Sequence, residues 1–233
     1  MSKQKIDPLG YNTSKELVDG IEQVIQFVRE HKVQTIVFPS SQDFWAKYLF
    51  KKTWSRKHPK DSLPEIFSLG NSIFRLGTAW TVSADMQADP KRFTQTILNA
   101  IKTRYPKQRG RNDLSHLGHT LVLVFEGQSG QMTNFVKQQL RDLKVPRISA
   151  IAMYKPDVQD QGAFDQVIYP KRKPIPSERI GKKIPKDDPA YEKRLRSEPK
   201  LLEEHLAKRK ALFLQKRNIK RTMNRTIRTR FPK

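Results

Sequence analysis

Cysteine is absent from this sequence of 233 residues, which excludes disulfides, thiolate nucleophiles and thiolate metal sites. The five histidines are scattered without the spacing of metal ligands, so we expect no metal site built from side chains. No apolar run approaches the roughly 18 residues that a membrane-spanning helix needs, so we expect no membrane partner. What remains is a chain whose chemistry depends on hydroxyls, amides, carboxylates and cations.

Acidic residues are also scarce: 23 Asp and Glu stand against 46 Lys and Arg, a net charge of +23. Residues 171–233 hold 22 of the cations and only 7 of the acids. We therefore predict a domain over residues 1–170, followed by a basic linker and helical tail over 171–233. Such a surplus indicates a polyanionic partner, because neutralised phosphates release counterions. Nucleic acid fits best, ahead of an acidic protein, a membrane surface, or a tail that aids only solubility.

Helical and strand patterns alternate along the first 170 residues. Apolar residues at helical spacing predict helices over 14–31, 42–58, 89–105 and 131–143. Short runs rich in Val and Ile predict strands over 33–41, 63–71, 120–125, 147–154 and 165–170. Strands without polar alternation are typical of a sheet buried on both faces. We therefore predict an α/β fold with a mainly parallel sheet flanked by helices.

The region after residue 170 has a different pattern. Five prolines among residues 170–189 predict an extended linker, and the sequence on either side of Pro199 is typical of a helical tail. Leu202, Leu206 and Phe213 are spaced to share one stripe of that tail. Ile219, Met223 and Ile227 form another at i, i+4 and i+8. The tail is either a helix packed on the domain with a solvated basic face, or a helix that becomes ordered along a phosphate backbone.

The segment FEGQSGQ, residues 125–131, follows the apolar run of the predicted strand 120–125. Its glycines permit a tight turn that points backbone N–H groups inward, and the next helix adds the positive end of its dipole. Glu126 stands where it could accept hydrogen bonds from two sugar hydroxyls, which makes it our candidate catalytic residue. An alternative is that the glycines serve only close packing. The candidate anion-binding residues here are Gly127, Gln128, Ser129, Gly130 and Gln131.

In the order and spacing of its elements, the stretch 14–170 resembles the phosphoribosyltransferase fold. The resemblance implies a loop that contacts pyrophosphate after the first strand, with Ser40 and Ser41 in it. It also implies phosphoribosyl pyrophosphate, or a nucleoside phosphate, bound with Mg²⁺. Two departures from the family pattern concern the chemistry. Phe125 replaces the first of the family's paired acids, and cations at 171–173 replace an aromatic that stacks the base.

Three functions follow from these observations. The first is a nucleic-acid-associated protein, RNA favoured over DNA, whose phosphoribosyltransferase-like domain binds a nucleotide or phosphate group. The second is an active enzyme that transfers phosphoribosyl or ribosyl groups. The third is a structural component of a ribonucleoprotein with protein partners. In each case we expect a cytoplasmic protein associated with a nucleoid or ribonucleoprotein.

The cations of the tail are the candidate contacts to nucleic acid, and no motif for reading a specific base sequence accompanies them. Trp54 lies among cations in the sequence and is the best tryptophan to stack on a base, whereas we expect Trp45 in the core. The candidate nucleic-acid-binding residues are Lys171, Arg172, Lys173, Lys208, Arg209, Lys210, Lys216, Arg217, Lys220, Arg221, Arg225, Arg228 and Arg230.

Overall fold

The computed structural model describes residues 11–39, 44–69, 90–104, 110, 112–124, 130–154, 162–169 and 196–232. The chain separates into two compact units, one of Met1–Val18 with Ile175–Lys233 and the other of Asp19–Pro174. The elements in chain order are α1 (Tyr11–Glu30), β1 (Thr35–Phe38), α2 (Phe44–Lys57), β2 (Glu65–Ser68), α5 (Pro90–Arg104), the short 3-10 helix η3 (Ser115–Leu117), β3 (His119–Val124), α6 (Gly130–Asp142), β4 (Arg147–Tyr154), β5 (Gln166–Tyr169) and α9 (Pro199–Arg230).

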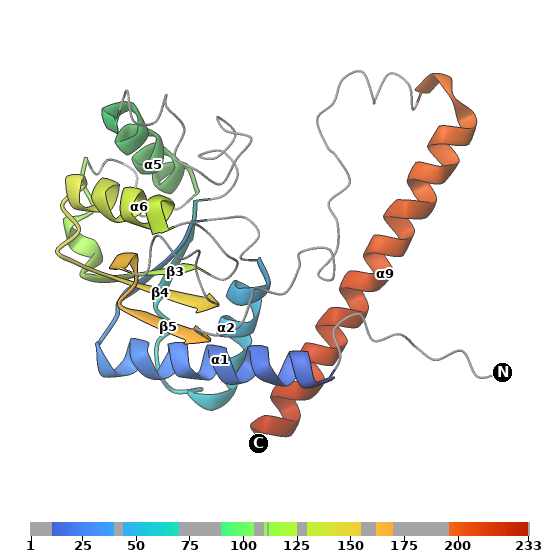
Figure 1. The fold of residues 1–233 in the computed structure, drawn as a ribbon, viewed down its shortest axis with the longest axis horizontal. Coiled ribbons are helices and arrows are strands. Elements are labelled where there is room, and N and C mark those ends of the chain that lie inside the picture. Colours follow the sequence, from blue (N-terminus) through green and yellow to red (C-terminus); the bar gives the residue numbers. More distant parts are fainter. Residues whose placement is uncertain are drawn as a thin grey trace. The chain divides into compact units, whose positions relative to one another are not determined.

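The Asp19–Pro174 unit is built on a sheet of five parallel strands in the order β2-β1-β3-β4-β5 (Figure 1). In this register Val37 of β1 lies opposite Phe67 of β2 on one side and Val122 of β3 on the other. The parallel sheet with flanking helices that the sequence predicts is therefore confirmed. The connections from β1 to β2, from β2 to β3 and from β3 to β4 pass through α2, α5 and α6 respectively, as crossovers between parallel strands usually do.

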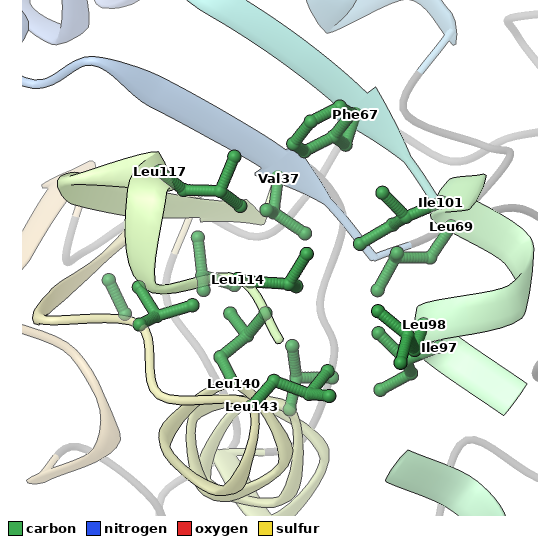
Figure 2. Packing of buried hydrophobic residues seen from close by; sticks show 14 of the residues in the cluster. Val37, Phe67, Leu69, Ile97, Leu98, Ile101, Leu114, Leu117, Leu140 and Leu143 are labelled. Atoms are coloured by element: carbon green, nitrogen blue, oxygen red, sulfur yellow. The ribbon is translucent and has the colours of Figure 1, made fainter. Parts of the chain in front are cut away.

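Every residue of β1 and β3 is buried, which explains why their sequences, TIVF and HTLVLV, show no polar alternation. On one face, Val37, Val122 and Ala150 belong to an apolar cluster that α5 and α6 complete (Figure 2). From α5 come Ile97, Leu98 and Ile101, and from α6 come Val136 and Leu140. Because side chains alternate along a strand, the intervening Ile36, Leu121 and Ile151 point to the other face.

Helix α1 begins near the predicted position and buries Ile21, Val24, Ile25 and Val28 along one side. Gly20 marks a close approach of this helix to the strands β4 and β5. A Cβ atom placed on Gly20 would lie 2.6 Å from Met153 Cε and 2.9 Å from Tyr169 Cε2. The absent side chain therefore lets α1 pack tightly against the sheet.

The two tryptophans of α2 are buried to the same extent, although the sequence predicts burial for only one of them. Trp45 is buried as predicted. The prediction that Trp54 stacks on bases at the surface is wrong: its side chain is only 5% exposed, and Nε1 donates to the carbonyl oxygen of Asp61 at 3.3 Å. The neighbouring lysines 51 and 52 are exposed while Trp54 faces inward, because they occupy other sides of the same helix.

Helix α9 is a single element of 32 residues that begins with Pro199 at its first position. Its buried residues are confined to the last part, where Ile219, Met223, Thr226 and Ile227 form a stripe. The linker predicted over 170–189 lies outside the described residues. Among the described helices, none is both long and apolar enough to cross a membrane.

Candidate functional site

The carboxyl ends of β1 and β3 form the point where the strand order reverses. From β1 the chain crosses to β2 on one side, and from β3 it continues to β4 on the other. In open parallel sheets, ligands bind beyond the strand ends at such a switch point. The two loops that the sequence analysis selects follow these two strands. Ser40 and Ser41 come after β1, and Glu126, Gly127, Gln128 and Ser129 come after β3.

These six loop residues lie outside the described residues, so only their anchoring elements can be placed. β1 and β3 are neighbours in register, with Ile36 opposite Leu121. The carboxyl ends of β1 and β3 therefore lie side by side at the same edge of the sheet. Gly130 and Gln131 are the first two residues of α6, as the sequence predicts for a loop that leads into a helix.

The first turn of α6 combines a buried glycine with a buried hydroxyl. Gly130 is buried, which fits a close backbone approach at the start of the helix. Thr133 is fully buried, and its Oγ1 has no hydrogen-bond partner within the described part of the chain. Buried hydroxyls are normally hydrogen-bonded, because an unsatisfied one is destabilising by about 1–3 kcal/mol. This hydroxyl and the free N–H groups of a helix start are suited to an anion.

Two tyrosines that the sequence analysis did not select end the neighbouring strands at the same edge. Tyr154 of β4 and Tyr169 of β5 are partners in the sheet register. Their ring centroids lie 5.5 Å apart with planes inclined by 32°. Burial, and to a lesser extent the charge of Asp19, raises the pKa of the Tyr169 hydroxyl. Their shared position, as the last residue of each strand, is a signal that the sequence contains.

The opposite edge of the sheet holds a buried histidine with structural partners. His119, at the start of β3, contacts the carbonyl oxygen of His31 through Nδ1 and Ser149 Oγ through Nε2, both at 2.9 Å. Burial lowers the pKa of His119 despite the hydrogen bond to His31. This network connects the turn after α1 with β3 and β4. Across the described residues, no cluster of three or more His, Asp or Glu side chains could hold a metal ion.

The cations of α9 form the second candidate site. Residues 208–230 contain ten Lys and Arg and no Asp or Glu. All ten cations are exposed. At 100° per residue, five of them lie within about 80° of one another around the helix, on the side opposite the buried stripe. This basic face consists of Lys210, Arg217, Arg221, Arg225 and Arg228.

A hollow of about 380 Å³ lies along the last turns of α9. It is lined by Arg221, Asn224, Arg225, Arg228 and Thr229. Three guanidinium groups, an amide and a hydroxyl supply hydrogen-bond donors, and the described residues of the lining include no carboxylate. The hollow is therefore suited to an anion. Of the predicted nucleic-acid contacts, Lys171, Arg172 and Lys173 lie outside the described residues.

No family model, curated protein or solved structure matches this chain. The candidate sites therefore depend on the chain's own residues: the sheet edge between β1 and β3, and the basic face of α9.

Proposed function

We propose that this protein binds nucleic acid, RNA in preference to DNA, through the basic face of α9. The observation that carries this proposal is the charge of residues 208–230, ten exposed cations without one acid. A helix that only needed solubility would tolerate acids among its cations, whereas a helix that follows phosphates is weakened by each one. The hollow lined by Arg221, Arg225 and Arg228 adds a concave position for a phosphate.

The geometry of a rigid helix fits this partner. Residues 208–230 span about 34 Å, at 1.5 Å per residue, so the cations meet a row of phosphates with little loss of backbone entropy. Binding of this kind depends on the phosphate backbone and not on base identity. We therefore expect little discrimination between RNA sequences and a steep dependence of affinity on salt.

The second candidate function belongs to the sheet edge. We infer that a nucleotide or phosphorylated ribose binds where the loops after β1 and β3 leave the sheet, in a phosphoribosyltransferase-like arrangement. The strand order, with its switch point between these two strands, supports this reading. The unsatisfied hydroxyl of Thr133 near the start of α6 supports an anion there. Glu126 would accept hydrogen bonds from the sugar, and Mg²⁺ would accompany a pyrophosphate.

Transfer of the phosphoribosyl group is the enzymatic alternative at this same edge. Phe125 stands where the related fold has a second acid, which weakens the arrangement for organising Mg²⁺ and ribose. Binding without turnover is therefore our preferred form of the proposal.

Fluorescence anisotropy with a labelled single-stranded RNA, at 50 mM and 200 mM salt, tests the nucleic-acid proposal. We expect affinity to fall by at least about 100-fold between the two conditions. Single-stranded DNA of the same sequence, titrated alongside, tests the preference for RNA. Affinity that does not change with salt would contradict it.

A thermal-shift series tests the sheet edge separately. Phosphoribosyl pyrophosphate with Mg²⁺, or a nucleoside monophosphate, should stabilise the protein by about 2.7 kcal/mol at a concentration 100 times its Kd. Glu126→Ala should remove that stabilisation while leaving RNA affinity unchanged. If no ligand shifts the melting temperature, the edge has no such site.

A further inference from the structure

The first half of α9 leaves an apolar face uncovered. Leu202, Leu206 and Phe213 are 41%, 53% and 66% exposed. Of the five large apolar side chains exposed in the described residues, these three and Leu214 lie on α9. Farther along the same helix, Ile219 and its neighbours are buried. An exposed run of this kind on an otherwise charged helix marks a docking surface.

The spacing of these residues is that of a helix-pairing seam. In helices that pack in pairs, the contact residues recur at alternating intervals of three and four, which keeps them on one side of the helix. The intervals between positions 202, 206, 209 and 213 are four, three and four. Leucine, leucine and phenylalanine fill three of the positions, and the stem of Arg209 fills the fourth. The next two positions at these intervals are Lys216 and Lys220. Because both are charged, the apolar part of this side ends at Phe213. We call Leu202, Leu206 and Phe213 the apolar seam.

The charged residues beside the seam indicate which partner covers it and in which orientation. Glu203 and Lys210 are seven residues apart and flank the seam on the same side. If two copies of α9 pair antiparallel, Glu203 of each copy lies beside Lys210 of the other, and this happens twice by symmetry. If they pair parallel, Glu198 falls beside Glu203 and the two stretches 208–230 repel along their length.

We propose that a second copy of this chain covers the apolar seam by antiparallel pairing of the first half of α9. The two basic stretches then extend in opposite directions from the shared seam, which minimises their mutual repulsion. The seam spans about 18 Å of helix, so the interface is small and the dimer forms reversibly with concentration. This pairing does not depend on the proposed nucleic-acid binding.

Sedimentation velocity of the full chain over a range of concentrations tests the pairing. We expect the wild type to shift from monomer to dimer, and Leu206→Glu to raise the dimer dissociation constant by at least about tenfold, because it replaces the central leucine of the seam with a charge. Leu214→Glu is the matched control. Leu214 is 46% exposed, against 53% for Leu206, and lies about 100° around the helix from the middle of the seam, so its replacement should leave the dissociation constant unchanged. Circular dichroism checks that each variant keeps its helix.

Charge reversal tests the orientation. Glu203→Lys should weaken the dimer, because it places two lysines together, and Glu203→Lys with Lys210→Glu should restore it. A parallel dimer would show no such rescue, and that result would overturn the antiparallel arrangement. A chain that stays monomeric at every concentration would overturn the proposal altogether. So would a result in which Leu206→Glu leaves the association state unchanged and lowers RNA affinity, since the seam would then belong to the nucleic-acid interface.

Discussion

The sheet of the Asp19–Pro174 unit and the helix α9 place their apolar and charged side chains in opposite ways. All ten residues of β1 and β3 are buried, so these strands contribute core and no surface. Residues 208–230 of α9 carry ten exposed cations and bury four side chains near the end of the helix. The sheet is therefore stabilised by its own packing, whereas α9 exposes a charged surface. Substitutions at matched positions in the two regions test this distinction.

The largest expected effect concerns the basic face. Replacing Lys210, Arg217, Arg221, Arg225 and Arg228 with Gln should reduce the salt slope of RNA binding by about 3.5, which corresponds to about 3000-fold weaker binding near 0.1 M salt. Fluorescence anisotropy across a salt series measures both quantities.

A matched control removes the same charge from the other unit. It replaces five exposed lysines there with Gln, namely Lys32, Lys51, Lys52, Lys60 and Lys91. We expect little change in RNA affinity. If both variants lose affinity equally, net charge decides binding and the distinction between the two regions is lost.

A pair of phenylalanines compares the packing of the two regions. Phe67 of β2 is fully buried in the cluster of Figure 2, and Phe213 of α9 is 66% exposed. Phe67→Ala should lower the free energy of unfolding by about 3–5 kcal/mol, and Phe213→Ala by less than about 0.5 kcal/mol. Urea denaturation at a concentration where the chain is monomeric provides both values. Equal losses would mean that Phe213 contributes as much to the free energy of unfolding as a residue of the sheet's core.

The turn before β3 provides a test of backbone conformation. Gly118 has φ +62°, and a Cβ atom there would meet the side chain of Gln34. Gly118→Ala should therefore lower the free energy of unfolding by about 1–3 kcal/mol. Gly162 has open space around it and no positive φ, so Gly162→Ala is the control and should change stability by less than about 0.5 kcal/mol. A larger loss of stability from Gly162→Ala than from Gly118→Ala would show that a side chain does not strain this turn.

The smallest expected effect is a pH dependence that belongs to the sheet unit. Burial lowers the pKa of His119, so the unfolded chain binds a proton at a higher pH than the folded one. Stability from this group is complete above about pH 6.5 and falls as the pH decreases, by at most about 1.4 kcal/mol per pH unit. The pKa of His58 is lowered mainly by burial, and His58 contributes in the same direction.

Urea denaturation between pH 5 and 8 measures this dependence. His119→Gln should reduce the loss of stability at low pH, while His116→Gln, at an exposed position, should preserve it. If the variant has the same dependence of stability on pH as the wild type, His119 is protonated equally in the folded and unfolded states.

The architecture of the sheet unit is accessible from the sequence because its elements have strong periodicity. Ile97, Leu98 and Ile101 recur at helical spacing and lie in one cluster, and the Val- and Ile-rich runs are strands. Pro90 is the first residue of its helix, as its missing N–H and fixed φ favour.

The candidate sites are less accessible, because they depend on which side chains meet in space. Trp54 has cations on either side in the sequence, yet it faces the core, since adjacent helical positions point in different directions. Tyr154 and Tyr169 are 15 positions apart and become neighbours only through the register of β4 and β5. Which of the tail cations share one face required the observed helix, whereas the stripe of Ile219, Met223 and Ile227 is visible in the sequence and is buried in the structure.

The measurement that tests the central claim most directly is the reactivity of lysines toward an acylating reagent, with and without RNA, read by mass spectrometry. Binding through the basic face of α9 predicts that Lys210, the one lysine of that face, becomes several-fold less reactive when RNA is added, while the five control lysines of the sheet unit keep their reactivity. Protection of the sheet unit's lysines, with those of α9 unchanged, would contradict it.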